Sequence, residues 1–316
     1  MWTSRRRSLA SSTERGCQHG VVPGCGARRS WPPIMPGGIG RAPEWPDQRR
    51  PRVASGPVTN RRARQTHHLR RDRDLITKTY RTWGRQEHHR EWTTLNLLAL
   101  HQPGLAPEPI SAELDREPPS ITMTALPGDP IVGYWTDDQI HLLAKAMRRL
   151  WDVPGDRPAP IDMHNAHYWR HLAARSLRPA SGVELRAFDL TVDWITGPAL
   201  NSLLDGRTLQ ILGQGDPQPG NMLYDGRGIR LVDFEDAGAS DVCFELANFA
   251  EHLGARGTGL DRLADLIDHD HRRYHLYRRL IASFWLFRLL PDPTGARPPR
   301  TAELHDQAVR LIDLFD

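Results

Sequence analysis

The stretch from residue 215 to residue 236 limits what this chain can fold into more than any other part of the sequence. It contains Asp216, then Asn221 five positions on, then Asp233 twelve positions beyond that. Two prolines and a glycine lie within residues 217–220, and they exclude a regular helix or strand there. Asp233 ends a short run rich in β-forming residues, 229–232. We therefore expect Asp233 at the mouth of a strand, where its side chain can reach a ligand.

These three side chains are of the kinds that phosphoryl transfer needs. The reaction requires a carboxylate that accepts a hydroxyl proton, and hard oxygen ligands for the Mg²⁺ that bridges the nucleotide phosphates. Asp216 can serve as the carboxylate, and Asn221 and Asp233 as the ligands. The catalytic loop of kinases also places four residues between its Asp and its Asn. A simple turn would explain one such Asp, but it explains the whole ordered set poorly.

The sequence resembles the aminoglycoside phosphotransferase and choline kinase family over roughly residues 53–290. That family's signature runs His-Gly-Asp, four residues, Asn, a strand that ends in Asp-Phe or Asp-Trp, then Asp-Ala-Gly and Asp-Leu-Ala. The corresponding residues here are Gln214-Gly215-Asp216, Asn221, Asp233-Phe234, Asp236-Ala237-Gly238 and Glu245-Leu246-Ala247. Gln214 replaces the usual His and Glu245 the usual Asp, which leaves the three chemically essential residues intact.

The resemblance implies an α+β, protein-kinase-like fold of two lobes, with a small β-sheet N-lobe and a mainly helical C-lobe. We expect a disordered basic tail over residues 1–46, a nucleotide-binding lobe over 47–127 and a helical catalytic and substrate lobe over 128–316. The tail is rich in Arg, Ser, Gly and Pro and has no hydrophobic period. An unstructured extension explains it best; a transit peptide and a nucleic-acid-binding arm are the alternatives.

The N-lobe contains the expected nucleotide ligands. Lys78 lies within a strand pattern over residues 74–80, and Glu91 begins a stretch of helical hydrophobic period. Kinase-type folds hold the α- and β-phosphates with such a Lys and fix it with a Glu of the next helix. Glu87 is an alternative partner, and a solvated edge lysine is the alternative reading of Lys78. Gly56 lies in a possible phosphate-covering loop, 55–60, which a plain hairpin explains about as well.

The remaining site residues also come from the resemblance. Met123 and Ala125 lie in the last expected N-lobe strand, 120–128, where a hinge backbone would bind the purine. Asp236 and Glu245 would line or brace the metal and substrate side. His67, His68, His88 and His89 form adjacent pairs that we interpret as surface residues. His252 could line the substrate cleft, although a core or cap histidine is the more common case.

Helical periodicity dominates after residue 128. Asp137 and Asp138 can cap a helix that carries apolar residues to position 150. Further helices are expected at 165–177, 198–204, 244–253, 260–277, 279–290 and 301–315, whereas 183–194 is mixed in character.

Charge is distributed unevenly along the chain. Residues 1–74 hold 16 Lys or Arg and 5 Asp or Glu, while the remainder holds 26 and 33. The acidic body would suit a cationic substrate such as an aminoglycoside, although a solvated acidic surface is the simpler explanation. The three cysteines form neither a disulfide framework nor a zinc site. The longest apolar run, 280–290, is too short for a membrane span, and no secretory signal is apparent, so we expect a soluble, cytoplasmic protein.

The function implied by the resemblance is transfer of the γ-phosphoryl group of ATP, or less commonly GTP, to a hydroxyl of a small molecule, with Mg²⁺ as the metal. The expected partners are the nucleotide and a hydroxyl acceptor, with no membrane or nucleic acid. The acceptor cannot be deduced, because acceptor loops vary widely within such folds. A pseudokinase, or nucleotide-binding scaffold, is the alternative; the presence of Lys78, Asp216, Asn221 and Asp233 argues against it.

Overall fold

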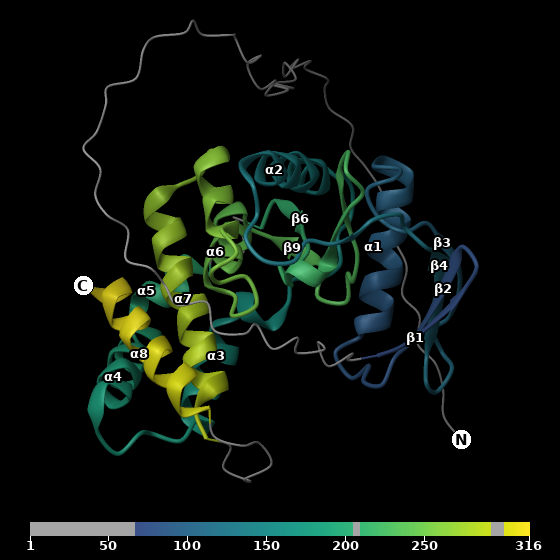
Figure 1. Cartoon of the computed structure of the whole chain (residues 1–316). Helices are drawn as coiled ribbons and strands as arrows, with labels where there is room; N and C mark the ends of the chain where they lie inside the picture. Colours follow the sequence, from purple (N-terminus) through teal and green to yellow (C-terminus); the bar gives the residue numbers. More distant parts are fainter. Residues whose placement is uncertain (1–66, 205–208, 292–299) are drawn as a thin grey trace, which may run out of the picture. The chain divides into compact units, whose positions relative to one another are not determined.

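The computed structural model describes residues 67–204, 209–291 and 300–316 (Figure 1). The chain divides into one unit of residues 1–60 and a second of residues 61–316, and all described residues belong to the second. The expected basic tail and Gly56 lie outside the described residues. No helix in the described ranges is both long and apolar enough to cross a membrane.

The N-lobe is a four-stranded sheet with one helix packed on it (Figure 1). Its strands are β1 (His68–Asp72), β2 (Leu75–Thr79), β3 (Pro109–Glu113) and β4 (Ser120–Thr124), and the helix is α1 (Glu87–His101). The strand order is β1-β2-β4-β3, with every neighbouring pair antiparallel. Ile121 and Met123 alternate inward along β4, as period-two patterning requires, and Leu95 and Leu98 of α1 are buried with them.

Lys78 lies in an inner strand of this sheet, paired with Leu69 on one side and Ile121 on the other. The expected strand is therefore confirmed. Helix α1 begins at Glu87, one turn before Glu91. The residue before it, Gln86, has a left-handed backbone (φ 63°), which turns the chain sharply into the helix.

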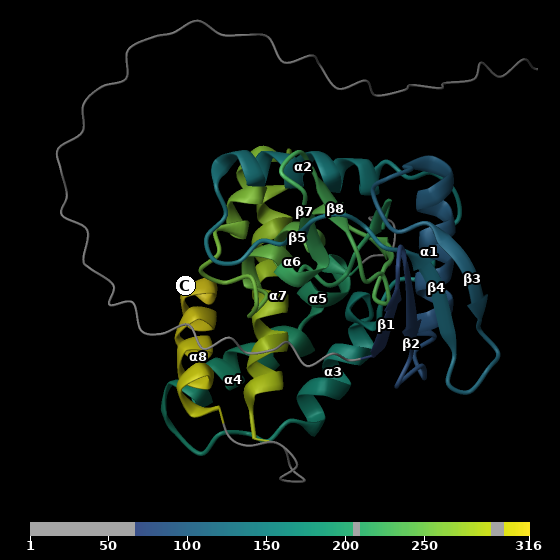
Figure 2. The ribbon, with the colours of Figure 1, turned by 45° about the vertical axis from the view of Figure 1, so that its right-hand side comes forward.

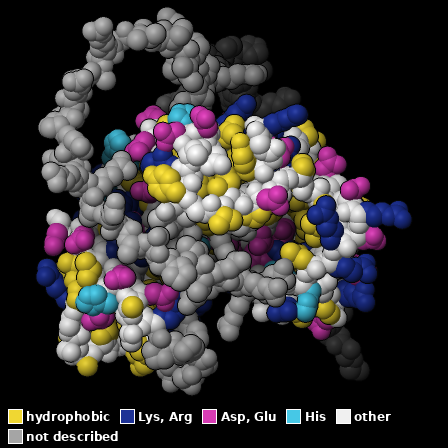
Figure 3. All heavy atoms as spheres, in the orientation of Figure 1, with side chains coloured by type: hydrophobic (Ala, Val, Ile, Leu, Met, Phe, Trp, Pro, Cys, Tyr) yellow, Lys and Arg dark blue, Asp and Glu magenta, His cyan; other side chains and the backbone are white. Residues whose placement is uncertain are grey.

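Lys and Arg side chains gather on the N-lobe surface, at the right of Figure 3. Among the N-lobe residues, Arg70, Arg71, Arg73, Arg81 and Arg116 are exposed. This sheet surface is basic, although the chain after residue 74 carries an excess of acidic residues.

The C-lobe is mainly helical (Figure 2). Its α-helices are α2 (Asp137–Trp151), α3 (Ala166–Arg175), α4 (Gly182–Thr196), α5 (Pro198–Leu203), α6 (Val242–Glu251), α7 (His271–Leu289) and α8 (Thr301–Phe315). Short 3₁₀ segments are η1 (Asp162–His164), η3 (Pro219–Asn221) and η4 (Leu260–Leu266). Two small antiparallel sheets, β5-β7-β8 and β6-β9, lie among them.

The strands of these small sheets flank the loops that the sequence singled out. They are β5 (Asp129–Pro130), β6 (Ile211–Gly213), β7 (Met222–Tyr224), β8 (Ile229–Leu231) and β9 (Gly238–Ser240). Asp216 follows β6, and Asp233 lies two residues past the end of β8. The predicted placement of Asp233 at a strand end is confirmed.

Several predicted boundaries need correction. Thr136, not Asp137 or Asp138, caps α2, through a reciprocal capping box with Gln139. The mixed segment 183–194 is the regular helix α4, because its apolar face packs against α8 and α3 and this packing outweighs local propensity.

The predicted helix 260–277 is also divided. Residues 260–266 form the 3₁₀ segment η4, and Asp270 then caps α7, which continues to Leu289 as one helix. The loop after Asp216 contains one 3₁₀ turn, η3, although no helix was expected there. Pro219 is tolerated at the start of that turn because its first N–H groups need no partner inside the helix.

Candidate active site

The loop after β6 is held from beneath by one buried carboxylate, that of Glu245 on α6. Its Oε2 accepts from the backbone N–H groups of Gln214 at 3.1 Å and Gly215 at 3.5 Å, and its Oε1 accepts from the Ser240 hydroxyl at 2.7 Å. The side-chain amide of Asn248 donates to the Gly215 carbonyl at 2.9 Å. These contacts connect the loop to α6 and β9, so its backbone is fixed on both sides.

Gly215 gives this loop its shape. Its φ is +81°, and a Cβ at this position would lie 2.2 Å from the carbonyl oxygen of Asp236. Glycine is therefore required by both conformation and space. The neighbouring Gln214 is buried, and its amide donates to the Val232 carbonyl at 3.2 Å. Gln214, which stands where the family signature has His, thus connects the loop to the residue before Asp233.

Asp216 stands at the open side of the loop. The side-chain amide of Asn221 donates to Oδ2 of Asp216 at 3.1 Å and to its backbone carbonyl at the same distance. Nε2 of His252 lies 3.4 Å from Oδ1 of Asp216. Burial, followed by the nearby charge of Asp236, raises the pKa of Asp216 to about 6. The carboxylate is therefore positioned by Asn221 and titrates close to neutral pH.

Lys78 forms the centre of a second cluster. Its Nζ lies 2.5 Å from Asp233, 2.7 Å from Glu91 and 2.9 Å from Glu235. Burial disfavours the ammonium, but the attraction of the three carboxylates outweighs burial and raises the pKa of Lys78 above its ordinary value. Lys78 is thus a buried cation that connects β2, α1 and the loop after β8.

Glu91 is fixed from several directions. Its Oε2 accepts from the hydroxyl of Tyr80 as well as from Lys78, and its Oε1 accepts from the backbone N–H of Phe234 at 3.2 Å. Phe234 is fully buried, and Asp233 before it has a positive φ of 64°. The structure therefore pairs Lys78 with Glu91, whereas Glu87, the alternative partner, contacts Arg85.

Oxygen ligands suited to a divalent cation lie in the same cluster. Carboxylate oxygens of Glu91, Asp233 and Glu235 lie within 4.8 Å of one another, and no other group of this kind is found among the described residues. Hard oxygen donors of this sort suit Mg²⁺. Asn221 belongs to the neighbouring loop, where its side-chain N–H donates a hydrogen bond to Asp216.

A cavity of about 630 Å³ opens beside Asp216. Its walls come from the loop before α1, the η1–α3 segment, the loops after β6 and β8, and α6 and α7. It is lined by Arg85, Ile161, Asp162, Met163, Tyr168, Arg175, Gly215, Asp216, Gln218, Glu235, Asp236, Asn248, His252, Phe284, Trp285 and Arg288. Glu235 both lines this cavity and contacts Lys78, so the two clusters meet at its edge.

The other predicted site residues are placed as follows. Asp236 lines the cavity and pairs with Arg85 at 2.8 Å. Glu245 is buried behind the loop and does not line the cavity. Met123 is buried in β4, and Ala125 follows that strand with its backbone N–H donated to the Asp74 carbonyl at 2.7 Å.

Sequence reasoning missed part of the site. Glu235 was not singled out, although its carboxylate contacts Lys78, and its place between Asp233 and Asp236 was the only signal. His67 and His88 are buried, so their assignment to the surface was wrong; Nε2 of His67 lies 2.5 Å from Glu235. His252 is the C-cap of α6, which confirms one interpretation; it also lines this cavity, whose role in substrate binding stays a prediction.

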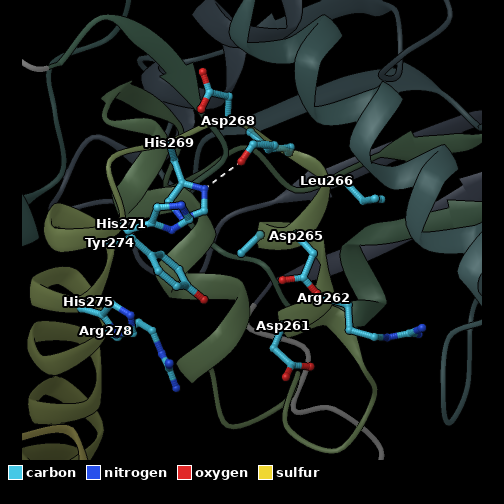
Figure 4. Close-up of a pocket in the computed structure, with 12 residues that line it drawn as sticks. Asp261, Arg262, Asp265, Leu266, Asp268, His269, His271, Tyr274, His275 and Arg278 are labelled. Carbon is cyan, nitrogen blue, oxygen red and sulfur yellow. Dashed lines mark hydrogen bonds between the residues drawn. The ribbon is translucent and has the colours of Figure 1, made fainter. Parts of the chain in front are cut away.

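A second cavity, of about 720 Å³, lies between η4 and the start of α7 (Figure 4). His269 points toward His271 and Tyr274 within it, and Nδ1 of His269 lies 2.7 Å from the Ile267 carbonyl. None of the predicted site residues lines this cavity. Asp216 and Asp236 line the smaller cavity instead.

The family model described as the phosphotransferase enzyme family (APH) matches residues 52–280. The chain belongs to this family. A comparison with curated proteins finds no match. Among solved structures, a choline/ethanolamine kinase family protein from Mesorhizobium loti is 14% identical, with a TM-score of 0.57 over 79% of this chain and 85% of that one.

Two further solved structures have the same fold. A GDP and kanamycin complex of APH(2")-IIia is 16% identical, with a TM-score of 0.55 over 77% of this chain and 86% of that one. Choline kinase LicA from Streptococcus pneumoniae is 16% identical, with a TM-score of 0.53 over 82% and 90%. These likenesses confirm the protein-kinase-like, two-lobed fold that the sequence predicted.

Proposed function

We propose that this protein transfers the γ-phosphoryl group of ATP to a hydroxyl group of a small molecule. One observation supports the proposal most strongly: the Lys78 cluster and the Asp216–Asn221 pair meet at a single cavity through Glu235. Phosphoryl transfer depends on positioning and on electrostatic stabilisation, and these two groups of side chains supply both.

Asp216 acts as the base in this proposal. The acceptor hydroxyl gives its proton to Asp216 as its oxygen forms a bond to the γ-phosphorus. The bond between that phosphorus and the β–γ bridging oxygen breaks, and the nucleoside diphosphate leaves with the bonding electrons. The pKa of about 6 keeps Asp216 ionised at neutral pH while leaving it basic enough to take the proton. Asn221 holds the carboxylate in orientation.

Lys78 would bind the α- and β-phosphates, with Glu91 holding its ammonium in place. Asn221 and Asp233 would hold Mg²⁺, whose role when bound is to neutralise the charge of the β- and γ-phosphates. The oxygen-rich donor set around Asp233 supports this assignment. Met123 and Ala125 would flank the purine; because the Ala125 N–H already bonds Asp74, Ala125 would contribute its carbonyl.

The test is Mg²⁺-dependent consumption of ATP by the full-length chain, with GTP in parallel, screened against a panel of hydroxyl compounds. We expect at least one acceptor to stimulate turnover and Asp216→Ala to remove the stimulation while nucleotide binding persists. Turnover that survives Asp216→Ala would refute the assignment of the base. Nucleotide binding that no acceptor converts into turnover would favour the alternative, a nucleotide-binding scaffold.

A further inference from the structure

The walls of the cavity beside Asp216 carry three arginines. Arg85 precedes α1, Arg175 is the last residue of α3, and Arg288 lies in the last turn of α7. All three side chains belong to exposed residues, so they border the entrance rather than the protein core. A cavity built for a cationic acceptor, the kind of substrate that the acidic body suggested, would not be expected to collect guanidinium groups.

Most of the acidic residues in this cavity already have partners. Glu235 contacts Lys78 at 2.9 Å, and Asp236 contacts Arg85 at 2.8 Å. Asp216 is held by Asn221. Asp162 is the remaining lining carboxylate, and no ion pair within the described ranges involves it. Two of the four lining carboxylates, those of Glu235 and Asp236, are therefore paired with a cation of the protein.

Among the three arginines, Arg175 differs from Arg85, which pairs with Asp236. Across the described part of the chain, no ion pair involves Arg175, which stands at the C-terminal end of α3. A lone guanidinium at a cavity wall can form two parallel hydrogen bonds to a carboxylate or to a phosphate. Arg175 is thus suited to bind an anionic group that enters from solvent.

The pKa of the Tyr168 hydroxyl depends on the charged groups that surround it in this cavity. Burial raises the pKa of Tyr168, and Arg288, Arg175 and Arg85 each oppose that rise because they favour the ionised form. Asp162 acts in the other direction. Three arginines from three separate elements therefore act on one hydroxyl in this cavity. Their combined field favours negative charge there.

Two aromatic side chains of α7 also line the cavity. Phe284 and Trp285 line the cavity with ring centroids 5.2 Å apart, and the ring of Trp285 lies edge-on to His252, with centroids 4.9 Å apart. Since His252 lies beside Asp216, the aromatic pair is connected to that carboxylate through His252. The apolar part of an acceptor would pack against these rings, with one polar group at Arg175 and another at Asp216.

We propose that the acceptor is a hydroxyl compound that also carries an anionic group, either a carboxylate or a phosphate ester, which Arg175 and Arg288 bind. This inference rests on the proposed phosphoryl transfer and narrows its substrate class. The reacting hydroxyl lies at Asp216 and the body of the acceptor lies along Tyr168 and Trp285. Polycationic amino sugars are poor acceptors because they would meet the guanidinium groups of Arg175 and Arg288.

The test compares matched acceptors with the full-length protein, Mg²⁺ and ATP. One arm contains hydroxycarboxylic acids and the corresponding neutral amides, another contains phosphorylated and unphosphorylated polyols, and a third contains aminoglycosides and amino alcohols. We expect stimulation by one of the anionic sets, which also identifies the anionic group, and little or none by the neutral or cationic sets.

Arg175→Gln then tests the proposed contact. Its KM for the anionic acceptor should rise roughly 10- to 100-fold, as expected for losing a hydrogen bond to a charged group, with kcat nearly unchanged. Arg175→Lys should fall between wild type and Arg175→Gln, because it keeps the charge and loses the paired geometry. The matched control is Arg170→Gln on the same helix; Arg170 contacts Asn201, does not line the cavity and should leave KM unchanged.

Three outcomes would contradict the inference. Preferential use of cationic or neutral acceptors would overturn it and leave the proposed phosphoryl transfer standing. An unchanged KM in Arg175→Gln would overturn it in the same way. Absence of acceptor-stimulated transfer across all three arms would overturn the proposed function, and the inference with it.

Discussion

Nζ of Lys78 lies 2.5 Å from Oδ1 of Asp233, although the two residues are 155 positions apart in the chain. This contact joins the N-lobe sheet to the loop after β8, and the bond from the Phe234 N–H to Glu91 adds a second connection at the same place. The groups proposed to bind the nucleotide therefore also hold the two lobes together. Substitutions at these residues should therefore change both nucleotide binding and the stability of the fold.

Lys78→Met should show this link directly. The substitution leaves three carboxylates within 4.8 Å of one another without their cation, which we expect to destabilise the fold by about 3 kcal/mol. Mg²⁺ can replace part of the lost charge, so rising Mg²⁺ should increase the Tm of the variant more than that of wild type. Lys145→Met, at an exposed position on α2, is the control. Equal Mg²⁺ dependence in all three proteins would refute this account of the cluster.

Gly215→Ala should disable the loop that carries Asp216. The new Cβ would lie 2.2 Å from the Asp236 carbonyl, at a backbone φ of +81° that disfavours side chains. We expect kcat to fall at least ~10-fold, since a small misplacement of a reacting group is costly. Gly220→Ala in the same loop is the matched control, because its Cβ would meet no atom within 4 Å. Similar kcat values for the two variants would contradict the proposed constraint.

Much of this site could be predicted from the sequence because its signals are local. The four residues between Asp216 and Asn221, and the strand before Asp233, are visible within short windows. The Lys78 strand and the helix that contains Glu91 follow from hydrophobic period alone. The structure brings these residues together as expected, although their roles in the reaction remain proposals.

The remainder depends on contacts between distant segments. Glu235 reaches Lys78 across 157 positions, and His67 is buried because Tyr80 and Glu235 lie against it. Helix α4 looks mixed by itself and is decided by its packing on α8. The arginines of the cavity come from three elements and have no common sequence pattern, so the charge of the cavity could not be read from the overall composition.

Glu245→Ala tests whether the carboxylate behind the loop supports the site. Removing Glu245 deprives the Gln214 and Gly215 N–H groups and the Ser240 hydroxyl of their acceptor. We expect a loss of about 3 kcal/mol in the free energy of unfolding, measured with urea, and a lower kcat. Glu245→Gln keeps a carbonyl oxygen for the backbone donors and should lose less of both. Wild-type stability and activity in the Ala variant would show that the contacts are incidental.

His164 should make the protein sensitive to mild acid. It is buried against Phe244, and burial lowers its pKa to about 4. Between the ordinary pKa of about 6.5 and this value, the unfolded chain binds a proton that the folded chain excludes, so stability falls as the pH decreases. At pH 5 the loss from this residue is about 2 kcal/mol.

The check is urea unfolding of wild type and His164→Asn at pH 7.5 and pH 5. The variant should lose less stability between the two pH values, whatever its stability at pH 7.5. His252, whose pKa burial also lowers to about 4, adds a similar dependence that both proteins retain. The exposed residue His167, changed to Gln, should leave the pH dependence as in wild type. An unchanged pH dependence in His164→Asn would exclude His164 as its source.

The central claim is that the Asp216 carboxylate accepts the proton of the acceptor hydroxyl, and the measurement that tests it most directly is single-turnover phosphoryl transfer by Asp216→Asn alongside the Kd for Mg²⁺-ATP. The account predicts a rate lower by roughly 10²- to 10⁴-fold, as for loss of a general base, with a nearly unchanged Kd. Asp189→Asn, whose carboxylate pairs with Arg178 on the surface, should keep the wild-type rate. A rate for Asp216→Asn within a few-fold of wild type, at unchanged Kd, would contradict the account.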